Sequence, residues 1–429
     1  MLVAISALIG MGAVSHCQVQ TTTGHLSPPP GRGYLHPACA YATNPDAPGL
    51  GDLVMVIWES DGSDSSYGVP IVRSRDNAES WGEPEYLEKF IQVGDDRIKF
   101  GPSSLFADPD NGTMVFFAQQ AYYEDNQLTS TFKKRRIIYR ISRDNGHTWS
   151  DRINLIQSGA DLAGKPFDET HWMQGAVWGR NMSSTIGAKA VKIRSEGPNK
   201  GKILLPFQQQ VVEGDGSLLM PAWGGFYASG CLIGTWNEQA TALSWDCGTM
   251  VTVSPKLSSR GVFEPTVAEL SDGRIIMIMR GSNSGLKGVT GCRFISVSED
   301  QGLTWSAPVP LLYDDISVVR SSSSYSVLIG LADGKVYFCA VLTDQTPDGN
   351  WPRYPVCLAQ IDPETLTVVK RSVLKVADRR DGDTDQVQYT CHWAYEDPHR
   401  QALIVLTPHI RGSIAGTAVD RHVVPLKLP

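Results

Sequence analysis

The sequence lacks the features that would assign it to a metal-binding, nucleic-acid-binding or membrane protein. Its eight cysteines include no Cys-x-x-Cys pair and have no histidine at zinc-ligand spacing, so we expect no metal and no other cofactor. Apart from Lys133 to Arg136 the chain has no block of basic residues, and its formal net charge is −7. Neither nucleic acid nor a membrane that the chain would enter is therefore an expected partner.

Long hydrophobic runs are scarce as well. One apolar segment, Leu2 to Ser15, has the length of a signal-peptide h-region and ends in small residues, although no basic residues precede it. It is too short for a comfortable membrane span. We therefore expect a signal peptide at residues 1–15 and a secreted or periplasmic protein. Cysteines of an exported protein either form disulfides or stay as buried thiols in strands, and for Cys339 and Cys357 the sequence leaves both open.

No segment holds a helical period over three turns. Residues 16–33 are polar and proline-rich, which predicts an irregular surface leader. From Tyr34 onward, short apolar runs of strand length alternate with turn signals, and the chain has 41 Gly and 26 Pro. The clearest runs are residues 53–58, 113–118, 136–142, 202–207, 274–279, 293–298, 335–342 and 402–408. The pattern predicts an all-β protein.

A turn motif repeats along these strands. Residues 142–149 and 298–305 share the pattern S-x-D-x-G-x-T-W, and residues 74–81 are a weaker copy with Ala78 and Ser80. The Asp bonds the amides of its own turn, Gly takes the left-handed position and Trp packs on the sheet, so the motif is a structural staple rather than a substrate contact. The spacing gives units of about 70 residues. This predicts a six-bladed β-propeller in which residues 34–429 form a single domain.

Residues 264–280, EPTVAELSDGRIIMIMR, read as a β-hairpin around an Asp-Gly turn. Glu264 opens the first strand and Arg280 closes the second, so the hairpin brings both charges to one end. That end is a candidate site, and the alternative is an ordinary exposed ion pair at a sheet edge.

These motifs resemble the sialidase superfamily, whose six-bladed propellers carry the same turn, the Asp-box. The resemblance implies that Glu264 supports the nucleophile and that Arg280 is one of three arginines binding a sugar carboxylate. The stretch SSYSVLIGLADGKVYF resembles the strand with the nucleophilic tyrosine, which is then Tyr325. The acid/base would be an Asp in the loop before the first Asp-box, where Asp64 is preferred over Asp61.

The chemistry accounts for these residue types. A sialic acid already carries a carboxylate at its anomeric carbon, so a neutral phenol attacks it without charge repulsion. A phenol with a pKa near 10 needs a neighbouring base, which would be Glu264. Arginine forks onto carboxylates with two parallel hydrogen bonds. The resemblance therefore implies an exo-acting, retaining α-sialidase-like glycoside hydrolase acting on glycans or oligosaccharides.

The chain departs from the family pattern at the first arginine, where it reads Tyr34-Leu35-His36-Pro37. His36 supplies at most one charged hydrogen bond there. For the third arginine the sequence offers Arg293 or Lys287. Two alternatives stay open, a propeller hydrolase for a different terminal sugar and a non-catalytic propeller that binds glycans or proteins. The cluster from Asp168 to Trp172 is either a sugar subsite or a loop between blades.

Overall fold

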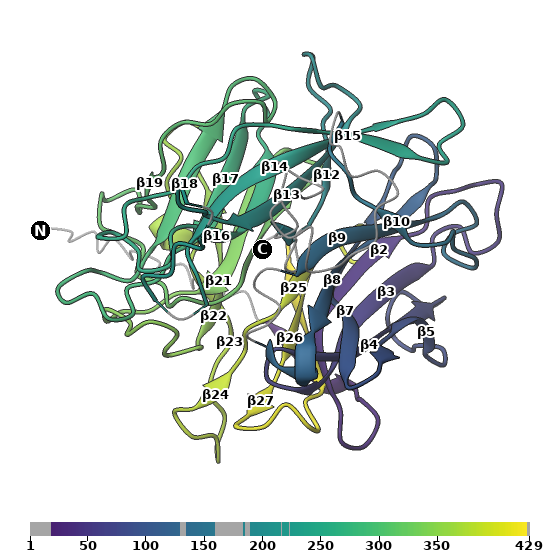
Figure 1. The fold of residues 1–429 in the computed structure, drawn as a ribbon, viewed down its shortest axis with the longest axis horizontal. Coiled ribbons are helices and arrows are strands. Elements are labelled where there is room, and N and C mark those ends of the chain that lie inside the picture. Colours follow the sequence, from purple (N-terminus) through teal and green to yellow (C-terminus); the bar gives the residue numbers. More distant parts are fainter. Residues whose placement is uncertain are drawn as a thin grey trace, which may run out of the picture.

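The computed structural model of the protein describes residues 19–128, 134–158, 183–184, 189–215, 217–222 and 224–426. The expected signal peptide at residues 1–15 and the cluster at residues 168–172 lie outside these described residues. Six antiparallel sheets are arranged around a central axis, which confirms the six-bladed propeller (Figure 1).

The first three blades follow each other in sequence. Blade 1 has the strand order β2 (Gly33–Tyr41), β3 (Leu53–Gly62), β4 (Ser65–Ser74) and β5 (Glu85–Lys89). Blade 2 has β6 (Ile91–Val93), β7 (Asp96–Ala107), β8 (Met114–Tyr123), β9 (Arg135–Ser142) and β10 (Ile153–Asn154). Blade 3 has β11 (Ser183–Ser184), β13 (Ile203–Gln210), β14 (Tyr227–Trp236) and β15 (Leu243–Cys247), with β12 (Val191–Lys192) also paired to β13.

The other three blades complete the ring. Blade 4 has β16 (Phe263–Glu269), β17 (Ile275–Arg280), β18 (Arg293–Ser298) and β19 (Val309–Pro310). Blade 5 has β20 (Ser326–Gly330), β21 (Val336–Val341), β22 (Val356–Ile361) and β23 (Leu374–Ala377). Blade 6 has β25 (Trp393–Asp397), β26 (Ala402–Pro408), β28 (Val419–Pro425) and β1 (Gln20–Leu26). The smaller elements are the pair β24 (Val387–Gln388) and β27 (Ile410–Arg411) and the 3-10 turns η1 (Glu124–Asn126) and η4 (Lys370–Ser372).

The strands read as continuous apolar runs because both faces of a blade are covered by its neighbours. In β3 every residue from Leu53 to Trp58 is buried. Neighbouring blades contact each other through one long strand each, as β2 does with β7 and β16 with β20. β25 contacts both β20 and β2, so the ring closes between blades 6 and 1. The core therefore consists of clusters between blades.

Three turns have the Asp-box geometry that the repeat predicts. Asp144 accepts hydrogen bonds from the amide and the hydroxyl of Thr148 at 2.8 and 2.6 Å, and Asp76 and Asp300 bond the residue four positions on in the same way. Gly146 has a φ of 80°, in the left-handed region that glycine favours. The tryptophans of the three boxes pack against the core without being fully enclosed, since Trp81, Trp149 and Trp305 are each partly buried against a core cluster.

The residue after the Asp of each box reaches back to the preceding blade. Asn145 donates from Nδ2 to the carbonyls of Asn44, Ala47 and Pro48, and its Oδ1 accepts from the amide of Asn44. Gln301 makes the same kind of contact with residues 195–199, and Asn77 with Asp397. All three residues have φ between 57° and 58°. We call these contacts the blade latches.

The leader at residues 16–33 is not irregular throughout. Residues 20–26 form β1, which pairs with β28 through register pairs such as Gln20 with Val423 and Thr22 with Arg421. The expectation was wrong because QTTTGHL has little apolar character and its pairing partner lies about 400 residues away in the chain. The outer strand of blade 6 thus comes from the start of the described chain.

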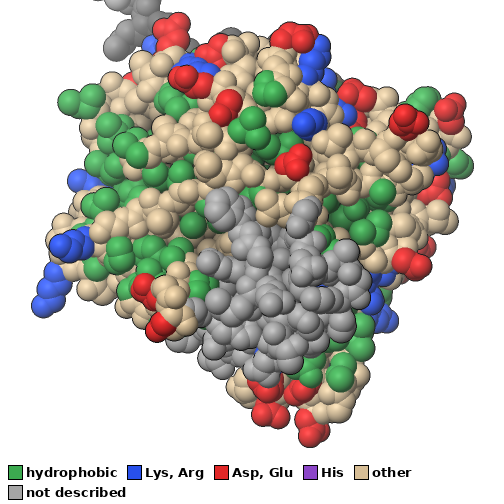
Figure 2. Space-filling model, turned by 45° about the horizontal axis from the view of Figure 1, so that its top comes forward, with side chains coloured by type: hydrophobic (Ala, Val, Ile, Leu, Met, Phe, Trp, Pro, Cys, Tyr) green, Lys and Arg blue, Asp and Glu red, His purple; other side chains and the backbone are tan. Residues whose placement is uncertain are grey.

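On the face shown in Figure 2, acidic and basic side chains of the described residues are scattered rather than gathered into a patch of one sign. No helix within the described ranges is long and apolar enough to cross a bilayer. Cys339 and Cys357 are buried thiols on the adjacent strands β21 and β22.

Candidate active site

A repeated bulge builds the site. In β2, β7 and β16 the pairing register shifts at an x-Pro dipeptide, at His36-Pro37, Gly101-Pro102 and Glu264-Pro265. The residues before proline have φ values of 44°, 120° and 46°. A bulge changes the direction of a side chain, and left-handed φ costs a non-glycine residue about 1 kcal/mol or more. All three residues line one pocket of about 200 Å³.

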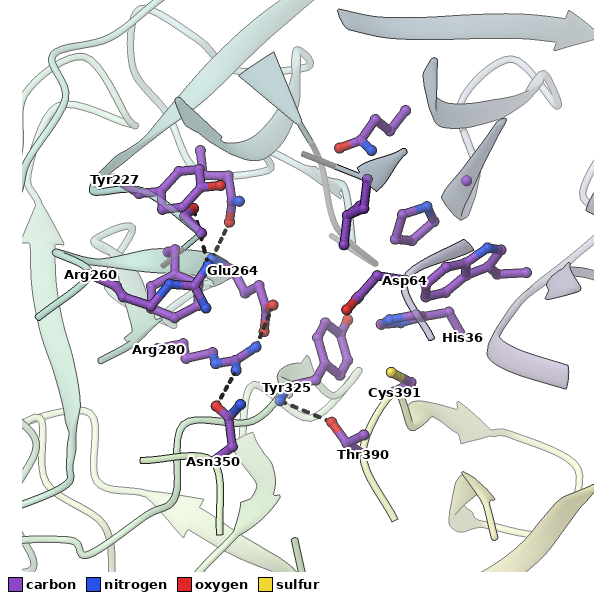
Figure 3. Close-up of a pocket in the computed structure, with 18 of the residues that line it drawn as sticks. His36, Asp64, Tyr227, Arg260, Glu264, Arg280, Tyr325, Asn350, Thr390 and Cys391 are labelled. Carbon is purple, nitrogen blue, oxygen red and sulfur yellow. Dashed lines mark hydrogen bonds and ion pairs between the residues drawn. The ribbon is translucent and has the colours of Figure 1, made fainter. Parts of the chain in front are cut away.

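The hairpin of β16 and β17 brings Glu264 and Arg280 together in this pocket. Arg280 Nη1 donates to Glu264 Oε1 at 2.5 Å, and both side chains are nine-tenths or more buried (Figure 3). Gln208 Oε1 accepts from the amide of Glu264 at 2.6 Å. The pair is therefore a buried ion pair within the pocket and not an exposed pair at a sheet edge.

Tyr325 stands just before β20 and also lines the pocket. Its ring is 4.7 Å from the ring of His36 and 5.4 Å from that of His392, both edge-to-face, and its amide donates to Thr390 Oγ1 at 3.3 Å. In Figure 3 the Glu264 carboxylate and the Tyr325 ring face the same space. The three residues Glu264, Arg280 and Tyr325 thus converge.

Burial and charge shift the pKa values of Tyr325 and Glu264 in opposite directions. Burial, and then the charge of Glu264, raises the pKa of Tyr325 well above its ordinary value. Burial opposes ionisation of Glu264, but the charge and hydrogen bond of Arg280 hold the pKa of this carboxyl below its ordinary value. Oε2 of Glu264 is buried without a hydrogen-bond partner among the described residues. Glu264 is thus an ionised acceptor close to a protonated phenol.

The loop between β3 and β4 delivers Asp64. Asp64 lines the pocket at a φ of 52°, and its side chain reaches toward Tyr325 in Figure 3. Tyr123 donates its hydroxyl to the carbonyl of Asp64 at 3.0 Å. Lys99 donates to Ser65 Oγ at 2.6 Å, and Ser65 donates to Asp61 at 2.7 Å. Strands β7 and β8 therefore hold this loop over the pocket.

Three of the candidate site residues, Asp61, Arg293 and Lys287, do not line the pocket. Asp61 is exposed and does not line the pocket, because its carboxylate faces Ser65 within the loop. Arg293 is fully buried outside the pocket and donates to Ser321 and Ser324 at 3.0 and 3.2 Å, below Tyr325. Lys287 is exposed in a separate surface depression.

His36 lines the pocket. It stacks on Trp58 with centroids 5.8 Å apart, and burial lowers its pKa to about 3. The imidazole is therefore neutral near pH 7, and it brings no positive charge to the pocket.

The sequence did not reveal several of the lining residues. Among the described residues three further arginines lie around the pocket, Arg135 on β9, Arg260 before β16 and Arg353 before β22. Neutral polar side chains and aromatic rings also line it, namely Trp58, Gln119, Tyr123, Gln208, Tyr227, Phe263, Asn350 and Thr390. Most of these residues stand on strands of different blades and share no local sequence signature, whereas the three x-Pro dipeptides were visible in the sequence and mark the bulges.

The fold and the bulged pocket at the blade ends define a six-bladed propeller of the sialidase type. The chain belongs to the BNR repeat-like domain family, which matches residues 51–398. The "Sialidase" of Paraclostridium sordellii is 25% identical over 248 residues, covering 56% of this chain and 49% of that protein, so the chain spans about half the length of this relative.

Solved sialidase structures have the same fold at low sequence identity. The Hadza microbial sialidase Hz136 aligns with a TM-score of 0.60 at 14% identity, covering 92% of this chain and 66% of that one. The intramolecular trans-sialidase from Ruminococcus gnavus, solved with oseltamivir carboxylate, aligns with a TM-score of 0.55 at 13% identity, covering 92% and 96%.

Proposed function

We propose that the protein is an exo-acting, retaining glycoside hydrolase of the sialidase type that releases a terminal sialic acid or a related acidic sugar from glycans. The observation that carries the proposal is the convergence of Tyr325, Glu264 and Asp64 in a pocket with four arginines. The relatives in sequence and in structure are named as sialidases, which supports the same activity. The apolar run at residues 2–15 supports export.

In the first step Tyr325 attacks the anomeric carbon, and the bond from that carbon to the leaving-group oxygen breaks. Asp64 gives its proton to that oxygen, while the phenol proton passes to Glu264. The pKa values of Tyr325 and Glu264 oppose this transfer in the empty pocket. Positive charge that develops at the anomeric carbon in the transition state favours the phenolate and so drives it.

In the second step water attacks the glycosyl-tyrosine. Asp64 accepts the proton of the water, Glu264 returns its proton to the Tyr325 oxygen, and the sugar leaves with its original anomeric configuration. The sugar carboxylate lies against Arg280 and Arg353. Arg353 donates from Nη1 to Gln388 at 2.9 Å, and its buried Nε has no hydrogen-bond partner among the described residues.

The neutral His36 is the observation that favours a different terminal sugar, because one expected carboxylate contact is missing. A screen of purified protein on aryl glycosides, with the sialoside included and the released sugar identified by mass, distinguishes an acidic sugar from a different terminal sugar as the substrate. If only an uncharged sugar is released, the neutral-sugar hydrolase replaces the acidic-sugar proposal. If no glycoside is hydrolysed, the result favours a non-catalytic binding propeller.

A further inference from the structure

Arg280, which the hairpin makes the most visible arginine of the pocket, has little capacity left for a ligand. Its Nε donates to Ser323 Oγ at 2.9 Å, its Nη2 to Ser323 O at 2.6 Å and to Asn350 at 3.0 Å, and its Nη1 to Glu264. A guanidinium has five N–H groups, so a single one, on Nη1, remains. Arg280 cannot fork onto a carboxylate while it holds Glu264.

Arg260, in contrast to Arg280, makes few hydrogen bonds with the described residues. Nη2 makes one long hydrogen bond, 3.3 Å to the carbonyl of Gly224, while Nε is buried with no partner and Nη1 has none among the described residues. No described acidic side chain forms an ion pair with it, since Glu264 is bound to Arg280. Because the Nε of Arg260 is buried and unpaired, a cation in this state costs free energy that a bound anion would recover.

The position of Arg260 fits an anion shared with Arg280. The guanidinium carbons of Arg260 and of Arg280 each lie 4.6 Å from the centre of the Phe263 ring, so they are no further apart than twice that distance. Both arginines line the pocket and flank the Glu264 carboxylate in Figure 3. Burial and then the charge of Arg280 lower the pKa of Arg260, and together they outweigh the opposing effects of Tyr227, Glu264 and Asp64.

We propose that Arg260 replaces the arginine that is absent at His36, and that it anchors the sugar carboxylate together with Arg353 and the remaining Nη1 hydrogen of Arg280. The anchor moves from blade 1 to the loop before β16, and the His36 and Trp58 side of the pocket becomes neutral. This inference rests on the proposed function, since it names the residue that recognises the acid group of that substrate.

The test compares binding of the 2,3-unsaturated analogue of N-acetylneuraminic acid with that of its methyl ester, by titration calorimetry. Wild-type protein should prefer the acid. Arg260→Gln should reduce the ratio of acid to ester affinity about 10-fold to 100-fold, because a charge-assisted hydrogen-bond pair is lost. Arg353→Gln should have a similar effect.

Arg260→Lys keeps the charge without the fork and should fall between wild type and Arg260→Gln, which preserves the test if the Gln variant folds poorly. Arg371→Gln on the exposed turn η4 is the control for the change in net charge, and it should bind as wild type does.

The outcomes separate this inference from the function on which it rests. An unchanged ratio in Arg260→Gln, with a reduced ratio in Arg353→Gln, overturns the role of Arg260 and leaves the acidic-sugar hydrolase standing. Equal wild-type binding of acid and ester, or no binding of either, overturns both.

Discussion

At the scale of single residues, Tyr325 and Glu264 differ in what their loss would do. Tyr325→Phe deletes one hydroxyl, and we expect turnover to fall by roughly 10³-fold or more while the thermal midpoint stays within a few degrees. Glu264→Gln should lose as much or less. The double variant should be little slower than Tyr325→Phe, because residues that act as a unit are not additive.

Initial rates on an aryl sialoside and thermal unfolding of the same samples provide the measurement. Near-normal turnover by Tyr325→Phe would eliminate the tyrosine mechanism. A fluorinated-sugar adduct trapped on another residue would assign the nucleophile to that residue.

At the scale of elements, the blade latches carry a prediction about stability. Asn145→Ala removes the side-chain bonds to residues 44–48 and should lower the free energy of unfolding by about 1 to 3 kcal/mol, measured by urea titration. Asn126→Ala is the matched control, because Asn126 also has a left-handed φ, 56°, but is exposed and has no side-chain bond among the described residues. If both variants lose the same free energy of unfolding, the loss comes from the left-handed backbone conformation and not from the hydrogen bonds of Asn145.

The elements also show where the sequence was informative. The Asp-boxes and the hairpin of residues 264–280 were predictable because their turns depend on residues within eight positions of each other. The strand β1 was not, since its partner β28 lies at the other end of the chain. Arg293 was misplaced because its guanidinium donates to Ser321, Ser322 and Ser324 away from the pocket. Arg260 and Arg353 reach the pocket only through the circular arrangement of blades.

At the scale of the whole molecule, four histidines connect stability to pH. Burial lowers the pKa of His36 to about 3 and the pKa values of His25, His392 and His422 to about 4. Between pH 6.5 and pH 4 the unfolded chain therefore binds more protons than the folded one. Their contribution to stability is complete above pH 6.5 and is lost as the pH falls toward 4.

Urea titrations at several pH values should show this loss beginning near pH 6.5, at about 1.4 kcal/mol per pH unit for each histidine. His392→Gln has a side chain that stays neutral, so the slope of unfolding free energy against pH should fall by the contribution of one bound proton. The same slope in both proteins would exclude His392 from the effect.

The closure of the ring gives a second prediction for the whole molecule. Removing residues 1–26 deletes β1 and leaves the edge of β28 without its partner. We expect a lower thermal midpoint and a stronger tendency to aggregate, because an exposed strand edge pairs with other chains. Light scattering and thermal unfolding of the shortened chain measure both, and unchanged values would show that β1 is dispensable.

The direction of the blade latches has a consequence for a chain that leaves the ribosome from its N-terminus. Asn145 and Gln301 each bind a blade already synthesised, about 100 residues earlier. Asn77 in blade 1 must instead wait for Asp397, and β1 must wait for β28. Blades 2 and 4 can therefore dock on the blade before them as soon as they are synthesised, while the first blade keeps an open side until translation is nearly complete. The nascent protein is an open arc that becomes a ring only in its last step.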